Sequence, residues 1–272
     1  MKPLAFIPGK KYPSVSITGP RCWLLCDYCK ARYLGGMIHI GSPKELYSVA
    51  HDVYVSGGYG LLVSGGFTRE GYLPVKPYIP VLGEIKRDFK LLISIHPGLI
   101  DRDTMIALRD AGVDIADYEL ILDEWVLRVL KHLNITVSDH IRHYEEMIEY
   151  GPPHVVPHIP IGFTVSDNWI YKAIDLLREY DPEITVFLVS MDSDHRIVER
   201  VLNILRKARS KLSGEISLGC MRPFKIKWVL DKKVIEEELV DRIVNPPSKY
   251  IREYGLRVVE TCCSIPRSLL PI

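Results

Sequence analysis

Three cysteines close to the start of the chain have a spacing that suits a metal cluster. Cys22, Cys26 and Cys29 form the pattern CxxxCxxC in a short loop that follows an apolar segment. Three thiolates from one loop can ligate three irons of a [4Fe-4S] cubane and leave the fourth iron without a protein ligand. Zinc is the alternative, but structural zinc takes four ligands, and no fourth Cys or His follows at zinc-ribbon spacing. The spacing therefore favours an iron-sulfur cluster with an open iron.

The other three cysteines lie in the last quarter of the chain, as Cys220 and the adjacent pair Cys262 and Cys263. This arrangement suits metal ligation better than a disulfide framework in a reducing compartment. Each group follows a segment with the pattern of a strand. If these two strands end side by side in a closed barrel, their three sulfurs meet at one face and could hold a second cluster. The alternative is a set of buried, inert cysteines.

Apolar runs and amphipathic stretches alternate along the whole chain. The expected strands are Ser14 to Thr18, Gly60 to Val63, Leu91 to Ile95, Ile115 to Leu120, His154 to Pro160, Ile184 to Ser190, Glu215 to Leu218 and Arg257 to Glu260. The helices expected between them include Pro43 to Ser56, Asp101 to Ala111, Asp139 to Tyr150, Asp167 to Glu179 and Asp194 to Leu212. Alternation at this spacing predicts parallel strands with right-handed crossovers. We expect an α/β fold in which residues 1–272 form one TIM-type β/α barrel, partial or full, with a doubly wound sheet as the alternative.

Polar residues follow several of these strands, at the ends where parallel α/β folds place their active sites. Ser64, Gly65 and Gly66 follow the second strand, and His96 follows the third. His154 and His158 lie near strand ends too, and each could line a pocket or be a core or loop residue.

Two acidic residues alternate on the fourth expected strand. Asp117 and Glu119 point to one face of Ile115 to Leu120, because side chains two apart share a face. Carboxylates on an apolar strand are costly unless they bind something, and a ribose diol is a suitable partner. A surface carboxylate at the strand end is the alternative.

Composition excludes several classes of function. The 272 residues carry 35 basic and 34 acidic side chains, a net charge of +1, which leaves no footprint for nucleic acid or an anionic membrane. No apolar stretch approaches the roughly 20 residues of a membrane span, and the first residues lack the apolar core of a signal peptide. We therefore expect a cytoplasmic protein. The absence of glutamine and the abundance of Ile, Arg, Glu and Tyr hint at a thermophilic source.

The CxxxCxxC loop resembles the signature of the radical S-adenosylmethionine superfamily, which has an aromatic residue just before the last cysteine. Tyr28 occupies that position here. The resemblance implies that the open iron binds S-adenosylmethionine and that the released 5′-deoxyadenosyl radical abstracts a substrate hydrogen.

The same resemblance implies the contacts of the cofactor. Ser64, Gly65 and Gly66 resemble the glycine motif that receives the methionine amino group, although Phe67 stands where Glu is common. The strand carrying Glu119 and Asp117 resembles the strand with ribose contacts, and Glu119 is the first choice. Ile159 and Ile161 resemble the residues that pack on adenine, and both could equally be barrel core.

Most of the chain is similar to the archaeal two-component lipoyl synthases, a biotin-synthase-like family. The similarity includes Arg32 to Met37, Gly219 to Pro223 and the terminal cysteine pair. It implies two [4Fe-4S] clusters. Cys220, Cys262 and Cys263 would ligate the auxiliary cluster, and the C-terminal segment 255–272 would contribute to its site. Ser264, Ser268 or Arg222 could be its fourth ligand.

The implied activity is sulfur transfer, with the auxiliary cluster as sulfur source. The substrate would be an octanoyl-lysine on a lipoyl domain or H-protein, and the terminal cysteine pair favours the partner that acts first, at C8. A second radical S-adenosylmethionine protein and an electron donor such as ferredoxin are the implied partners.

Two other functions compete with this one. Sulfur insertion into dethiobiotin, as in biotin synthases, would use cysteines on the middle strands, and Leu91 to Ile95 and Ile115 to Leu120 have none. A non-catalytic iron-sulfur electron carrier would ligate each cluster with four cysteines and would not need an open iron.

Overall fold

The computed structural model describes residues 2–271, which form two compact units. Unit 1 comprises residues 2–7, 119–122 and 156–271, and unit 2 comprises residues 8–118 and 123–155. Each unit consists of parallel strands connected by helices. The alternation expected from the sequence is therefore present in both units.

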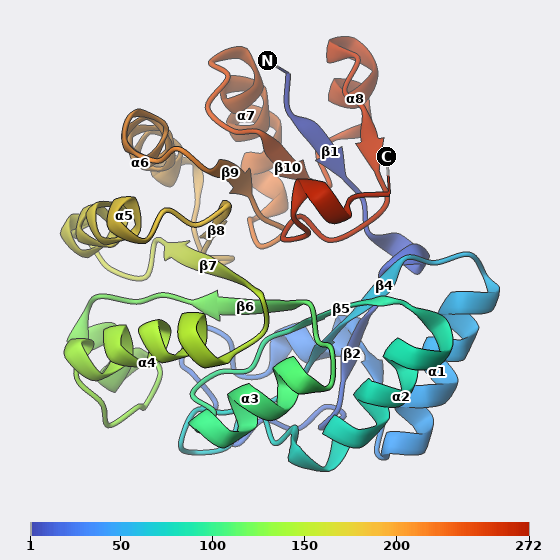
Figure 1. The fold of residues 1–272 in the computed structure, drawn as a ribbon. Coiled ribbons are helices and arrows are strands. Elements are labelled where there is room, and N and C mark those ends of the chain that lie inside the picture. The colour runs from blue at the N-terminus through green and yellow to red at the C-terminus, as the bar shows by residue number, and fades with distance from the viewer. Residues whose placement is uncertain (1, 272) are drawn as a thin grey trace. The chain divides into compact units, whose positions relative to one another are not determined.

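Unit 2 carries five neighbouring strands in the order β6-β5-β4-β2-β3. Their bounds are Ser14–Ser16 for β2, Ile38–His39 for β3, Gly60–Ser64 for β4, Leu92–Ile95 for β5 and Ile115–Glu119 for β6, whose last residue belongs to unit 1. The helices of this unit, which flank these strands in Figure 1, are α1 (Pro43–Val55), α2 (Ile79–Phe89), α3 (Arg102–Asp110) and α4 (Val137–Tyr150). Short helical turns cover Gly9–Lys11, Arg32–Gly36, Lys76–Tyr78 and, as a π-helical turn, Val126–Leu130.

Side-chain caps fix where the helices of unit 2 begin. The Ser42 hydroxyl accepts a hydrogen bond from the Glu45 amide at the start of α1. Thr136 and Asp139 form a reciprocal capping box at the start of α4. Such caps satisfy amide groups that have no partner inside the helix and contribute about 1 kcal/mol each.

Unit 1 carries its strands in the order β11-β1-β10-β9-β8-β7. Their bounds are Leu4–Phe6 for β1, His154–Ile161 for β7, whose first two residues belong to unit 2, Ile184–Val189 for β8, Glu215–Leu218 for β9, Arg242–Val244 for β10 and Val258–Val259 for β11. The helices are α5 (Asn168–Tyr180), α6 (Val198–Lys211), α7 (Phe224–Glu236) and α8 (Ser248–Tyr254), with helical turns at His195–Ile197 and Arg267–Leu269.

All eight expected strands are present, with ends that differ by a few residues, and three more strands join them. Two of the additional strands, β1 and β10, lie between β9 and β11. The expectation that the strands before Cys220 and before Cys262 are neighbours is therefore wrong. β1 comes from the start of the chain and β10 has only three residues, so neither gives the periodic pattern that identifies a strand in a sequence.

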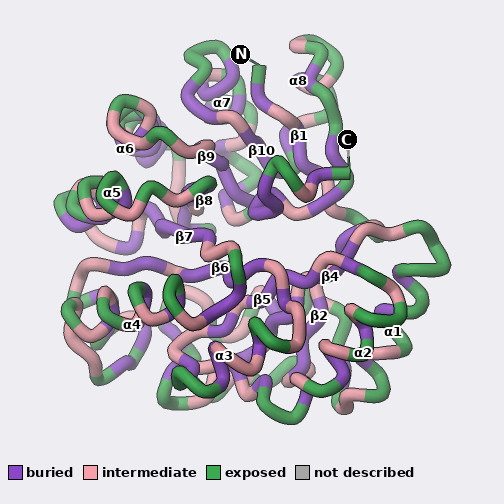
Figure 2. The backbone as a smooth tube through the Cα atoms, in the orientation of Figure 1, coloured by how far each residue is buried: buried purple, intermediate pink, exposed green. Residues whose placement is uncertain are grey.

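The core of each unit is built from its strands and from the inner faces of its helices, and the purple segments of the tube in Figure 2 mark these buried residues. Leu61, Val63, Ile93 and Ile95 of unit 2 have no exposed surface, and Ile216, Leu218 and Ile243 have none in unit 1. Strands buried on both faces read as continuous apolar runs, which is the pattern expected under helices on a parallel sheet. None of the described helices is both long enough and apolar enough to cross a membrane.

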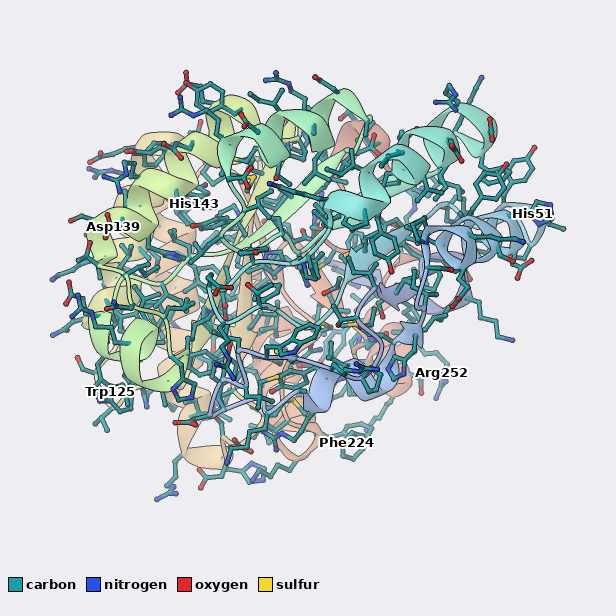
Figure 3. All side chains as sticks on the ribbon, turned by 90° about the horizontal axis from the view of Figure 1, so that it is seen from below. His51, Trp125, Asp139, His143, Phe224 and Arg252 are labelled. Carbon is teal, nitrogen blue, oxygen red and sulfur yellow. The ribbon has the colours of Figure 1, made fainter. Side chains whose placement is uncertain are left out.

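A buried histidine cluster connects α4 to β6 within unit 2. The Tyr118 hydroxyl lies 3.4 Å from Nδ1 of His140 and 3.1 Å from Nδ1 of His143, which projects from α4 (Figure 3). Burial lowers the pKa of His140 to about 3, and the charges of Lys131 and His143 lower it further. His140 is therefore neutral in the folded protein at neutral and mildly acidic pH.

We expect this cluster to make the folded state less stable in acid. The unfolded chain protonates His140 near pH 6.5 whereas the folded chain does not, so stability is full above pH 6.5 and falls as the pH drops below it. At about pH 5 the free energy of unfolding should be about 2 kcal/mol lower because of His140 alone. Urea unfolding at about pH 7.5 and about pH 5 should show this loss in the wild type and a correspondingly smaller one in His140→Phe. Equal losses in the two proteins would contradict the assignment.

Candidate functional site

The loop of Cys22, Cys26 and Cys29 is fastened to the segment that follows β4. The amides of Trp23 and Leu24 both donate to the carbonyl oxygen of Phe67, at 2.9 and 3.2 Å. The Cys22 thiol points to the same carbonyl, with a sulfur-oxygen distance of 3.9 Å. Two loops at the C-terminal ends of neighbouring strands therefore hold each other, as the expected fold requires of its active-site end.

Gly66 sets how closely these two loops approach. Its amide donates to the Thr18 hydroxyl at 2.7 Å, and the same hydroxyl donates to the Arg21 carbonyl at 2.8 Å. A Cβ atom on Gly66 would lie 1.9 Å from the Arg21 carbonyl oxygen and 2.4 Å from Cα of Cys22, distances that no side chain permits. Only glycine therefore fits beside the first cysteine. The sequence indicates the glycine motif but not this steric role.

A second anchor comes from the residues after the π-helical turn. The Asp27 amide donates to the Leu130 carbonyl at 2.8 Å, and the Cys26 thiol points to the Lys131 carbonyl, 4.0 Å away. The Asp27 carboxylate lies 3.2 Å from Nε2 of His132. Nothing in the sequence marks 126–132 as part of the site, because its contacts with the cysteine loop span about a hundred residues.

A buried lysine faces the three thiols. Lys131 has only 5% of its surface exposed; burial lowers its pKa, and the charges of Cys26, Cys29 and Cys22 act in the opposite direction. Burial also raises the pKa of Cys26 and of Cys29, and the Lys131 charge partly offsets this at Cys26. Burial likewise raises the pKa of Tyr28, whose side chain contacts Cys26.

These residues fit an iron-sulfur cluster. Three soft thiolate donors come from one loop, which matches a cubane with one open iron. The buried ammonium of Lys131 can balance part of the negative charge that thiolates and sulfides bring into a desolvated site. Among residues 2–271 no three His, Cys, Asp or Glu side chains gather closely enough to hold a single metal ion.

Ser64, His96 and Asp117 form a chain of polar contacts across the ends of β4, β5 and β6. The Ser64 hydroxyl lies 3.3 Å from Nδ1 of His96, and Nε2 of His96 lies 3.6 Å from the Asp117 carboxylate. The Asp117 side chain is 1% exposed, whereas that of His96 is 37% exposed. Asp117 is therefore not a surface carboxylate. Its carboxylate lies beside His96 but beyond hydrogen-bond distance, and a ribose contact stays a prediction.

The other predicted cofactor contacts lie in unit 1. Glu119 is half-buried at the end of β6, and the side chains of Ile159 and Ile161 on β7 are fully buried. Core residues have the same burial, so adenine packing also stays a prediction. His158 is buried, and its Nδ1 lies 3.0 Å from the Val156 carbonyl oxygen. Burial lowers its pKa to about 4, so His158 is a neutral core residue.

The remaining cysteines lie in two loops of unit 1, after β9 and after β11. Sγ of Cys262 lies 3.2 Å from the Ser264 hydroxyl. A hydrogen bond from Cys263 lowers the pKa of Cys262 and raises that of Cys263, and the charge of Cys220 raises the latter further. The three sulfurs therefore lie within electrostatic range of one another. This thiolate set also fits an iron-sulfur cluster.

The structure separates the three candidates for a fourth ligand. Arg222 is wrong for this role, because its guanidinium is fully buried in hydrogen bonds to Asp231 and to backbone carbonyls. Ser268 is exposed on the turn Arg267–Leu269. Ser264 is fully buried beside Cys262, so it fits the role best.

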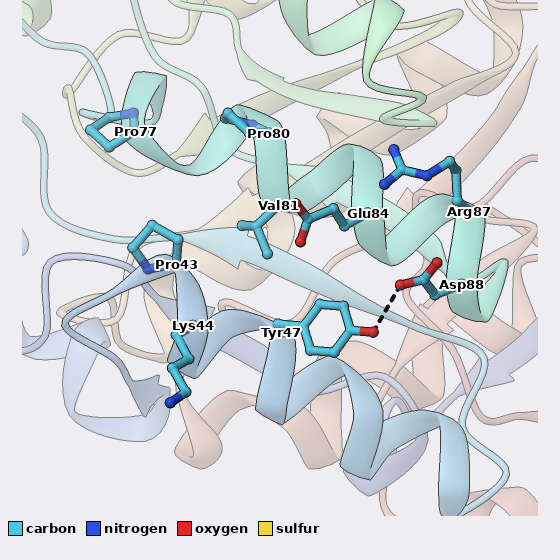
Figure 4. Close-up of a pocket in the computed structure, with 9 residues that line it drawn as sticks. All are labelled: Pro43, Lys44, Tyr47, Pro77, Pro80, Val81, Glu84, Arg87 and Asp88. Atoms are coloured by element: carbon cyan, nitrogen blue, oxygen red, sulfur yellow. Dashed lines mark hydrogen bonds between the residues drawn. The ribbon is translucent and has the colours of Figure 1, made fainter.

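Two cavities of unit 2 differ in their relation to the cysteine loop. The smaller, about 210 Å³, adjoins the cysteine loop and is lined by Trp23, Leu24, Arg69 and His132. The larger, about 510 Å³, lies between α1 and α2, where Tyr47 donates to Asp88 at 2.8 Å (Figure 4). No residue of the cysteine loop lines it, so the smaller cavity is the one connected with the site.

Known proteins resemble this chain in structure alone. No family model and no curated protein sequence matches it. Methylornithine synthase PylB superimposes with a TM-score of 0.65 over 94% of this chain and 83% of its own, at 12% identity. The [FeFe]-hydrogenase maturase HydG superimposes with a TM-score of 0.64 over 95% of this chain, also at 12% identity. SuiB of Streptococcus suis, solved with S-adenosylmethionine bound, gives 0.53 over 96%, at 13% identity.

These similarities show the fold alone, which is the α/β fold with a partial β/α barrel that the chain shares with PylB and HydG. The expected fold class is therefore confirmed. The chain spans 64% of the HydG chain and 50% of the SuiB chain, so it is much shorter than either of them.

Replacing Gly66 with Ala should displace the cysteine loop. The added methyl group would overlap the Arg21 carbonyl and the Cys22 backbone, and overpacking of this kind costs about 1–3 kcal/mol. In a protein whose Cys220, Cys262 and Cys263 are Ala, we expect Gly66→Ala to lose most of the iron bound after anaerobic reconstitution.

Gly36→Ala is the matched control, because a Cβ there meets no atom within 4 Å. It should keep its iron. Full iron in Gly66→Ala would show that the close approach of the two loops does not position the cysteines.

Proposed function

We propose that this chain is a radical S-adenosylmethionine enzyme whose first [4Fe-4S] cluster is held by Cys22, Cys26 and Cys29. The observation that carries the proposal is the three-thiol loop, held on both sides and faced by the buried Lys131. Its fold, shared with PylB, HydG and the S-adenosylmethionine-bound SuiB, supports the same function. A structural zinc site would need a fourth protein ligand, which the cysteine loop does not supply.

Cys22, Cys26 and Cys29 would hold the cluster, which would supply the electron for reductive cleavage of S-adenosylmethionine. The residues of the chain hold and shield the reactants. Gly66 and Phe67 keep the loop against β4, and the buried ammonium of Lys131 offsets negative charge beside the thiolates. Ser64, Gly65, Gly66, Asp117 and Glu119 are the proposed cofactor contacts, and Ile159 and Ile161 are the proposed apolar wall for adenine.

We further propose that the reaction is sulfur attachment to a protein-bound octanoyl chain, as a component of a lipoyl synthase that acts first, at C8. Support comes from Cys220, Cys262 and Cys263, which supply thiolates for a second cluster within unit 1. An unactivated carbon requires a radical, and the carbon radical then requires a nearby sulfur. Since none of the three similar proteins is named for sulfur insertion, this part of the proposal depends on the cysteines and on the resemblance of the sequence.

The proposal implies several partners. The octanoyl-lysine carrier would be a lipoyl domain or H-protein, a second radical S-adenosylmethionine protein would complete the product, and a ferredoxin-like protein would supply electrons. The cytoplasm is the reducing compartment where such clusters persist.

Replacing Cys22, Cys26 or Cys29 with Ala should abolish reductive cleavage of S-adenosylmethionine, because a cluster with two thiolates is labile and its open iron is misplaced. Formation of 5′-deoxyadenosine under dithionite, measured by chromatography, is the test. Cys220→Ala is the control and should retain cleavage. Normal cleavage by any of the three variants would refute the assignment of the first site.

Replacing Cys220, Cys262 and Cys263 together with Ala should uncouple the reaction. The triple variant should hold about half the iron of the wild type, because each cubane contains four irons, and should still form 5′-deoxyadenosine. It should form no thiolated product from an octanoylated lysine peptide, as judged by mass spectrometry. Unchanged iron would show that these cysteines ligate nothing, and normal thiolation would show that the sulfur has another source.

A further inference from the structure

Two buried arginines hold the two cysteine loops of unit 1. Arg242, the first residue of β10, has no exposed surface, and Arg222, two residues after Cys220, is 1% exposed. A buried guanidinium is costly unless its N–H groups are paired, so the partners of each arginine show what its burial achieves.

Arg242 holds the loop of the cysteine pair. One of its terminal nitrogens donates to the Cys263 carbonyl at 2.8 Å and to the Ile265 carbonyl at 2.5 Å. Its Nε and its other terminal nitrogen donate to Glu215, the Nε bond being 2.8 Å long. Glu215 also accepts a 2.6 Å hydrogen bond from Arg267, beyond the cysteine pair. The segment with both cysteines is therefore fixed to β9 and β10 through charged hydrogen bonds.

Arg222 holds the loop of Cys220. Its Nε and one terminal nitrogen donate to the two carboxylate oxygens of Asp231, each at 2.8 Å, in a bidentate pair, and Asp231 has no exposed surface. It also donates to the Gly219 carbonyl at 2.6 Å and to the Val244 carbonyl at 2.7 Å. Val244 is the last residue of β10, so β10 anchors both loops.

All of these contacts join protein groups to one another. The carbonyls that accept from the arginines belong to Cys263, Ile265, Gly219 and Val244, whereas the sulfurs themselves take no part. The backbone of both loops is therefore fixed without any metal–sulfur bond, unlike small metal sites that fold only around their metal.

We propose that Arg242 and Arg222 are positioning residues that keep Cys262, Cys263 and Cys220 as a preformed ligand set. The site then keeps its shape when the group bound there is lost, and it can take up iron and sulfide again without local refolding. This inference rests on the proposed second cluster, because a preformed ligand set matters only where these cysteines bind one.

Hydrogen exchange of the wild type, followed by mass spectrometry, tests the inference before any variant is made. Amides of residues 219–223 and 260–266 should exchange at the same rate before and after a chelator removes the iron. Much faster exchange in the iron-free protein would overturn the proposal, because the cluster rather than the arginines would then hold the loops.

Arg242→Met and the more conservative Arg242→Lys should loosen the loop. In the iron-free form, residues 260–266 should exchange about tenfold faster than in the wild type, which corresponds to losing about one buried hydrogen bond. After reconstitution, the variants should hold about half the wild-type iron and still cleave S-adenosylmethionine. Lys keeps the charge but cannot bridge Glu215 and two carbonyls, so Arg242→Lys tests geometry even if the Met variant does not fold.

Arg206→Met is the matched control, because Arg206 forms a similar bidentate pair with Glu237 on an exposed surface of unit 1. It should leave exchange and iron content unchanged. Wild-type exchange in Arg242→Lys would overturn the inference. A wild type that holds only one cluster would instead overturn the proposed function, whatever the exchange rates are.

Discussion

The approach of Gly66 to the backbone of Arg21 and Cys22 is the constraint on which the first site depends. The parallel ladder of β2 and β4 brings both loops to the same end of the sheet, and the missing side chain of Gly66 lets them touch. The Phe67 carbonyl can then accept two amides of the cysteine loop. The position of Cys22 is therefore a consequence of strand register in unit 2, transmitted through a single residue without a side chain.

Buried positive charge beside sulfur occurs in both units but acts in different ways. Lys131 faces the thiols of the first site, where its ammonium can balance negative charge. Arg222 and Arg242 are neutralised by Asp231 and Glu215, and their remaining N–H groups hold backbone carbonyls. A flexible ammonium suits charge balance, whereas a planar guanidinium with five donors suits fixed geometry. The two kinds of side chain therefore match the two proposed tasks.

Much of the fold could be predicted, and the exceptions have physical reasons. β4, β5 and β9 are apolar runs whose bounds follow directly from the sequence. α2 contains Pro80 and Gly83, which indicate a break, yet Pro80 lies in the first turn, where a missing amide costs nothing. β1 and β10 have three residues each, and only pairing with each other and with their neighbours makes them strands.

The sequence by itself determined which residues could do chemistry, because the spacing of Cys22, Cys26 and Cys29 and the pair Cys262 and Cys263 are local patterns. It also determined the alternation of strands and helices, because hydrophobic periodicity is local as well. Only the tertiary structure decided which side chains surround the sulfurs. Lys131 lies beside the loop of Cys22, Cys26 and Cys29, about a hundred residues away in the sequence, and Arg242 on β10 donates to the carbonyl of Cys263 in the loop after β11. Contacts between residues so far apart depend on strand order and register, and no local pattern records either of them.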